Sequence, residues 1–131
     1  MSDSYPSDLL YTRDHEWARI EGKLATIGIS RFAVDQLGDI TQVELPKEGD
    51  QVKKGEVMGT VESVKAVSDI FAPVSGKVVK VNDPLADNPQ YVNEDPYDEG
   101  WMVQIELASP DETKELLNVE AYLQMLKEAE A

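Results

Sequence analysis

The chain of 131 residues has the length of one domain, and its 41% hydrophobic content is enough for a buried core. Its 26 acidic residues outnumber 12 Lys and Arg, and the formal charge of −14 argues against nucleic-acid binding and against a polybasic membrane anchor. The chain has no Cys and one His, His15, which excludes disulfides, cysteine nucleophiles and thiolate or poly-His metal sites, so no metal is expected.

Targeting signals are missing from the sequence pattern. The first residues lack the basic and apolar stretches of a leader peptide, and no segment approaches the roughly eighteen apolar residues of a membrane span. We therefore expect one soluble domain over residues 1–131, without membrane contact, in the cytoplasm of a bacterial-type cell.

The first third of the chain predicts a hairpin followed by one helix. Segments rich in β-branched residues at 17–20 and 24–29 are separated by a Gly-containing turn, which is typical of a hairpin. Ser30 is placed to cap a short helix over 31–37, and Gly38 is placed to end it.

The middle of the chain predicts further strands at 40–45 and 57–63, separated by turns. Along the second of these strands, Val57, Gly59 and Val61 alternate and are predicted to share one face.

A lysine-bearing tip follows, and then more strands. Lys65 lies between 57–63 and a strand at 67–71, and another strand is predicted at 77–82. Residues 82–100, with three Pro and three Asn, predict a long surface connection made of turns. Alternating apolar residues at 101–107 predict a half-buried strand.

The C-terminal segment predicts helices over residues 110–128, outside a β core at 11–108. Ser109 and Glu112 have the spacing of a capping box, and a break is expected near Asn118. The apolar side of these helices is expected to lie on the sheet; its residues are Leu116, Leu117, Leu123 and Leu126. The pattern as a whole predicts a small β-sandwich with helical additions.

Catalytic patterns are sparse. His15 and Glu16 are adjacent, but there is no Gly-flanked Ser nucleophile, no Walker A motif and no dinucleotide-binding motif. We therefore predict that the chain is not an enzyme. Among nine lysines, Lys65 alone occupies the predicted tip between two apolar strands. The residue pattern leaves open whether this lysine solubilises the hairpin or is a modification site.

Several motifs occur in one order along nearly the whole chain. They are 11–17 (YTRDHEW), 27–29 (IGI), 37–40 (LGDI), 43–46 (VELP), 59–66 (GTVESVKA), 72–79 (APVSGKVV), 93–97 (NEDPY) and 100–102 (GWM). Together they resemble the glycine cleavage system H protein family. The resemblance implies a mainly β, barrel-sandwich hybrid fold, with a short internal helix and C-terminal helices.

The resemblance also implies a cofactor and partners. Lipoic acid is expected in amide linkage on Lys65, within an attachment motif that comprises Glu62, Ser63, Val64 and Ala66. The chain is expected to be a monomer that carries the aminomethyl group of glycine from a pyridoxal-phosphate glycine decarboxylase (P-protein) to a tetrahydrofolate-dependent aminomethyltransferase (T-protein). Dihydrolipoyl dehydrogenase (L-protein) would reoxidise it, and a lipoylating enzyme would load it.

A cleft for the loaded arm is implied in the same way. By position, Glu16 and Asp69 would hold the protonated aminomethyl nitrogen, with Asp14 as a further candidate. His15 and Trp17 are expected to be packing residues of the opening strand.

Four alternative functions are weighed. A biotin carrier usually has Met on both sides of the lysine, and a 2-oxo-acid dehydrogenase lipoyl domain usually has Asp before it; here Val64 and Ala66 flank Lys65. A lipoate-relay protein, which donates lipoyl groups to other enzymes, fits the same sequence. In an unmodified binding module, Lys65 would have no chemical role.

Overall fold

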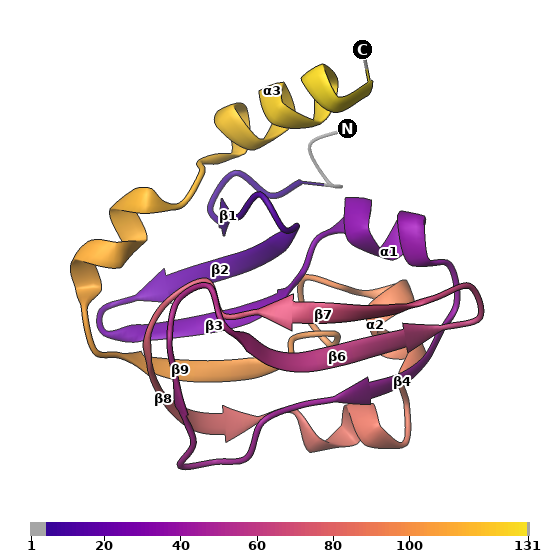
Figure 1. Cartoon of the computed structure of the whole chain (residues 1–131), viewed down its shortest axis with the longest axis horizontal. Helices are drawn as coiled ribbons and strands as arrows, with labels where there is room; N and C mark the ends of the chain where they lie inside the picture. Colours follow the sequence, from indigo (N-terminus) through magenta and orange to yellow (C-terminus); the bar gives the residue numbers. More distant parts are fainter. Residues whose placement is uncertain (1–4, 131) are drawn as a thin grey trace.

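The computed structural model describes residues 5–130 and shows two antiparallel sheets that do not close into a barrel (Figure 1). The larger sheet has the order β1-β2-β3-β9-β8-β5, and its strands are β1 (Leu10–Tyr11), β2 (Glu16–Glu21), β3 (Leu24–Ile29), β9 (Val103–Leu107), β8 (Gly76–Val81) and β5 (Gln51–Val52). The smaller sheet has the order β4-β6-β7, and its strands are β4 (Ile40–Glu44), β6 (Val57–Ser63) and β7 (Val67–Phe71). The predicted mainly β sandwich is confirmed.

Short helices connect and flank the sheets. They are α1 (Arg31–Leu37), η2 (Asp83–Ala86), α2 (Gln90–Glu94), η3 (Pro110–Glu115) and α3 (Val119–Glu130). The predicted cap of α1 is confirmed, because the Ser30 hydroxyl accepts a hydrogen bond from the Ala33 amide at 3.4 Å. Gly38 ends the helix at φ +79°, a backbone conformation that favours glycine. Within residues 5–130, no helix has both the length and the apolar character to cross a membrane.

Two buried clusters hold the molecule together. The main core lies between the sheets and joins side chains such as Ile27 of β3, Val61 of β6 and Ile70 of β7. The second cluster lies beneath α3 and is rich in aromatic residues; it comprises Leu9, Tyr11, Trp17, Tyr97, Tyr122 and Leu126.

One face prediction for β6 is wrong. The register between β6 and β7 shifts between Val57 and Gly59, which is the signature of a β-bulge. The bulge changes the alternation, so Val57 is 53% exposed while Val61 is buried. The three residues therefore do not share one face.

The connection at 82–100 is also different from the prediction. It contains η2 and α2 rather than turns alone, and both short helices contact β4. Leu85 and Val92 in these helices are fully buried, so the segment contributes to the core. The side chain of Asn82 donates to the Glu99 and Trp101 carbonyls at 2.8 and 2.7 Å and fixes the base of the connection.

The strand that follows begins two residues later than predicted. β9 starts at Val103, and the preceding Met102 is fully buried, so the expected alternation holds only from Val103 onward.

The predicted break between the C-terminal helices is confirmed, but the predicted capping box at Ser109 is wrong. Ser109 makes no side-chain cap; instead the Glu112 carboxylate accepts from the amide and hydroxyl of Ser75 at 2.7 and 2.9 Å. The break is confirmed at Asn118, whose side chain accepts from the Ala121 amide at the start of α3.

α3 lies beside β1 rather than flat on a sheet (Figure 1). Tyr122 and Leu126 face inward from this helix, whereas Leu123 is 42% exposed, which corrects the predicted apolar side.

Candidate functional site

The tip between β6 and β7 is closed by one serine. The Ser63 amide donates to the Ala66 carbonyl at 2.8 Å. Its hydroxyl accepts from the Lys65 and Ala66 amides, each at 3.1 Å, and contacts the Ala66 carbonyl at 3.2 Å. Ser63 is itself buried. The backbone that carries Lys65 is therefore fixed by a compact hydrogen-bonded turn.

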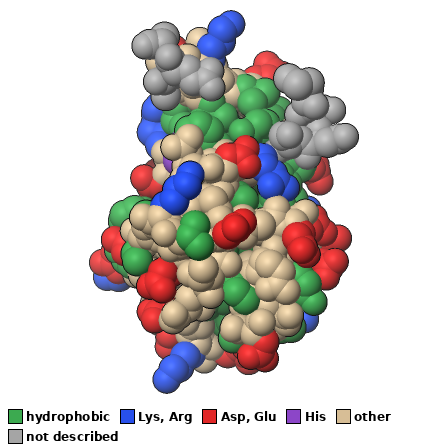
Figure 2. Space-filling model, turned by 90° about the vertical axis from the view of Figure 1, so that its right-hand side faces the viewer, with side chains coloured by type: hydrophobic (Ala, Val, Ile, Leu, Met, Phe, Trp, Pro, Cys, Tyr) green, Lys and Arg blue, Asp and Glu red, His purple; other side chains and the backbone are tan. Residues whose placement is uncertain are grey.

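The side chains at this tip are exposed. Val64 and Val67 are 68% and 63% exposed, and Glu62, Lys65 and Ala66 are exposed with them. Figure 2 shows the end of the molecule at which this hairpin lies, with acidic side chains spread among hydrophobic ones. The ion pairs formed within residues 5–130 do not involve Lys65. The amine is therefore open to a modifying enzyme.

A buried carboxylate lies at the other end of β7. Glu16 is 2% exposed, and its two oxygens accept from the Thr12 hydroxyl at 2.7 Å and from the Phe71 amide at 3.2 Å. Burial raises the pKa of Glu16 to about 7, Asp14 adds to the rise, and the two hydrogen bonds oppose it. This side chain therefore changes its charge near neutral pH.

Glu16 borders a groove of about 280 Å³. Asp14 lines the same groove, as do Thr12, Ala72 and Pro73. Asp69 does not line it; this exposed residue lies in the middle of β7, two positions before Phe71. The structure thus brings Glu16 and Asp14 together and places Asp69 on the strand between Lys65 and the groove.

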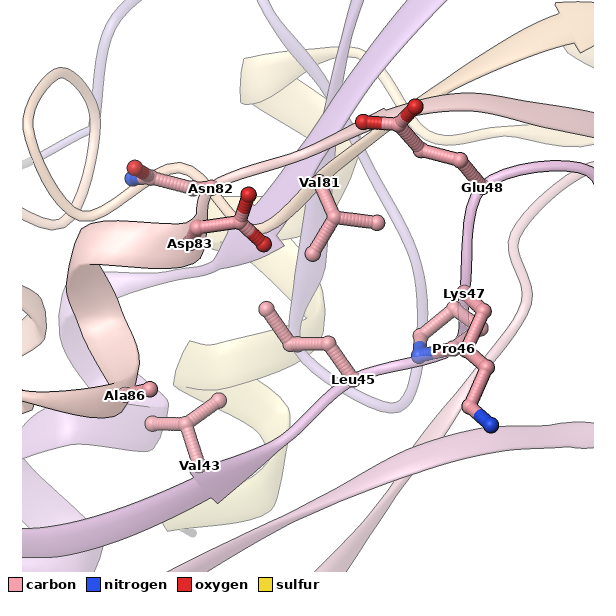
Figure 3. A pocket seen from close by; sticks show the side chains of 9 residues that line it. All are labelled: Val43, Leu45, Pro46, Lys47, Glu48, Val81, Asn82, Asp83 and Ala86. Carbon is pink, nitrogen blue, oxygen red and sulfur yellow. The ribbon is translucent and has the colours of Figure 1, made fainter.

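A second hollow, of about 430 Å³, lies elsewhere, beyond the far end of β4 (Figure 3). Val43, Leu45 and Val81 point into it, and charged side chains stand at its rim. None of the predicted site residues lines this hollow.

The chain matches the family model described as Glycine cleavage H-protein over residues 9–129. The chain belongs to the glycine cleavage H-protein family. The H protein is the lipoyl carrier of the glycine cleavage system, so the resemblance drawn from the sequence motifs is confirmed.

Individual members of the H-protein family match nearly end to end. The glycine cleavage system H protein of Anaeromyxobacter sp. (strain K) is 56% identical over 125 residues, which cover 95% of this chain and 98% of that protein. The H protein of Staphylococcus epidermidis (strain ATCC 35984) is 48% identical over 123 residues, which cover 94% and 98%. The crystal structure of an H protein from Mycobacterium marinum has a TM-score of 0.86 at 39% identity and covers 93% of this chain and 98% of its own.

Sequence patterns identified Trp17 as a packing residue but gave no signal for the polar contact of Thr12. Trp17 is fully buried and donates from its ring nitrogen to the Pro96 carbonyl at 2.9 Å, as expected of a packing residue. His15, at φ +71°, precedes β2, and its ring nitrogen lies 2.8 Å from the Tyr122 hydroxyl. The role of Thr12 was missed, since a single Thr gives no signal until the fold shows that it contacts Glu16.

Proposed function

We propose that Lys65 carries lipoic acid in amide linkage and that this chain is the mobile carrier of the glycine cleavage system. The observation that carries this proposal is the exposed Lys65 amine on a hairpin turn fixed by Ser63. Exposed Glu62, Val64 and Ala66 beside it supply a surface that a lipoylating enzyme could recognise. A ligase needs both an accessible nucleophile and a repeatable backbone position, and this tip provides both.

The carrier would take the aminomethyl group of glycine from glycine decarboxylase to the tetrahydrofolate-dependent aminomethyltransferase, and dihydrolipoyl dehydrogenase would restore it. When bound, lipoic acid supplies a disulfide that is reduced as the one-carbon amine is taken up. The protein's own task is to present Lys65 to each partner and to shield the reactive end from water between visits.

Glu16 is suited to hold the protonated amine. An ammonium group near a buried carboxylate favours the ionised form and lowers its pKa, so the pair would form readily at neutral pH. Asp14 at the groove and Asp69 on β7 would add negative charge along the path from Lys65. Ala72 and Pro73 give the groove apolar walls, and Arg13 and Lys54 also line it.

Domain organisation, assembly and location complete the proposal. Residues 1–131 would act as one carrier domain, although residues 1–4 and 131 lie outside the described part of the chain. The carrier would be a cytoplasmic monomer.

The proposal is tested by mass spectrometry of the chain after incubation with lipoate, ATP and a purified lipoylating enzyme. We expect one lipoyl group on Lys65, none in Lys65→Arg, and normal loading in Lys77→Arg, which removes an exposed lysine of β8. Lipoylation elsewhere, or none on the wild type, contradicts the proposal.

The carrier role is tested by glycine-dependent release of carbon dioxide with the purified partner enzymes. Activity should require the loaded wild-type chain and be lost in Lys65→Arg. A loaded chain that supports no glycine turnover, yet passes its lipoyl group to other proteins, would instead establish the lipoate-relay function.

A further inference from the structure

We infer that Gly38 and Asn93 form a platform beneath the hairpin tip that positions the Lys65 side chain for acylation. The inference rests on the proposed function, and it assigns to these two residues a positioning role in the loading reaction. In that reaction a C–N bond forms between Nζ and the carbonyl carbon of an acyl adenylate. The bond from this carbon to the phosphate oxygen breaks, AMP leaves with the electron pair, and the ammonium group gives up two protons.

The lysine stem lies over a residue that has no side chain. A Cβ built on Gly38 would come within 3.3 Å of Lys65 Cε and 3.8 Å of both Cδ and Nζ. The first distance is tighter than ordinary van der Waals contact, so a methyl group at this position would displace the lysine stem by a few tenths of an ångström. Glycine at position 38 thus leaves room for the Lys65 stem and also adopts the positive φ that ends α1.

Asn93 fixes the bend that contains Gly38. Its side-chain nitrogen donates to the Gly38 carbonyl at 2.9 Å, and its side-chain oxygen accepts from the Ile40 amide at 2.8 Å. The Asn93 side chain is thus hydrogen-bonded to the peptide groups on both sides of Asp39. Asn93 is held in turn, since its carbonyl accepts from the Arg31 guanidinium at 2.9 Å.

The bend is tied directly to the tip. The Val64 amide donates to the Asp39 carbonyl at 3.1 Å, so one hydrogen bond links the bend to the residue before Lys65. Asn93 thereby sets the position of the bend, and the bend supports both the backbone beside Lys65 and the side chain of Lys65. A pre-positioned stem loses less freedom when the ligase binds, which raises the rate of transfer.

Two variants test the platform, each with a matched control. Asn93→Asp removes the donor to the Gly38 carbonyl, whereas Asn88→Asp makes the same change at a side chain that donates to the Pro84 carbonyl in the same connection. Gly38→Ala adds a methyl group against the lysine, whereas Gly49→Ala adds one at φ +95° with nothing within 4 Å. The second pair therefore shares a positive φ and differs in the contact with Lys65.

The measurements are kcat/KM for lipoylation of Lys65, by a purified lipoylating enzyme with lipoate and ATP, and exchange of the Val64 amide by NMR. Both are made at a temperature where each variant is folded. We expect Asn93→Asp and Gly38→Ala to lower kcat/KM about tenfold. Asn93→Asp should also speed Val64 exchange, while both control variants resemble the wild type.

The outcomes are distinct. The platform is overturned if Asn93→Asp is lipoylated as fast as Asn88→Asp. It is also overturned if Gly38→Ala is lipoylated as fast as Gly49→Ala. Either result leaves the carrier proposal intact. A wild-type chain that is never lipoylated on Lys65 overturns both. If Gly38→Ala fails to fold, the Asn93→Asp comparison decides alone.

Discussion

Replacing Glu16 with Gln should make the protein more stable at neutral and alkaline pH. The buried carboxylate must ionise as the pH rises, and its burial makes the charged form unfavourable in the folded state. Gln keeps the size and the hydrogen-bonding oxygen of the side chain but never ionises, so the Phe71 amide keeps its acceptor.

The direction and size of the effect follow from proton linkage. The pKa of Glu16 is about 7 in the folded protein against an ordinary value of 4.5, so between these pH values the folded state binds more protons than the unfolded state. The stabilisation from the neutral carboxyl is complete below 4.5 and is lost as the pH rises through about 7. A shift of this size corresponds to about 3 kcal/mol.

The assay is urea unfolding followed by circular dichroism between pH 4 and 8.5, for wild type and Glu16→Gln. The free energy of unfolding of the variant, minus that of the wild type, should rise with pH by about 3 kcal/mol and level off above pH 7.5. Taking the difference cancels the pH-dependent contributions of the other acidic residues to the free energy of unfolding. Glu21→Gln, which changes an exposed glutamate at the far end of the same strand, should give a flat difference.

A flat difference for Glu16→Gln would refute the reasoning. It would mean that Glu16 titrates alike in the folded and unfolded states, so that its burial does not penalise the charge. The groove would then lack a carboxylate tuned to neutral pH, and the proposed role of Glu16 in holding an ammonium group would lose its physical basis.

Two further substitutions test the packing around the site. Gly28→Ala would place a methyl carbon 2.6 Å from the ring of buried Trp17, so we expect a loss of about 1–3 kcal/mol in urea unfolding; unchanged stability would contradict this packing. Tyr122→Phe keeps the aromatic ring but loses hydroxyl contacts to His15 at 2.8 Å and Ser30 at 2.7 Å. It should cost about 1–2 kcal/mol and speed amide exchange in α3, and an unchanged exchange rate would argue against the anchoring role of Tyr122.

Local sequence signals predicted the elements whose stabilising contacts are themselves local. The α1 helix was predicted because its cap at Ser30 and its end at Gly38 depend on neighbouring backbone groups. The β6 and β7 strands and the tip with Lys65 were predicted because β-branched residues and turns recur at short spacing. The family followed from several ordered motifs together.

Long-range contacts explain the errors. Leu123 and Tyr122 are neighbours on α3, and only the docking of this helix beside β1 decides that the tyrosine is buried and the leucine exposed. The bulge at Val57 depends on the register with β7, which no local signal specifies. Val92 is buried because α2 contacts β4, although its surrounding Pro and Asn residues resemble a surface turn.

The sequence by itself determined the family, most of the strands and the lysine at the tip, because each signal is a short local motif and the motifs occur in a fixed order. It did not indicate the two-residue strands β1 and β5. The tertiary structure alone decided the surroundings of that lysine and of Glu16. The Asn93 side chain donates to the Gly38 carbonyl, more than fifty positions away in the sequence. Glu16 accepts a hydrogen bond from the Phe71 amide across a similar separation. Burial and pKa depend on such pairings, and they exist only once the sheets have packed.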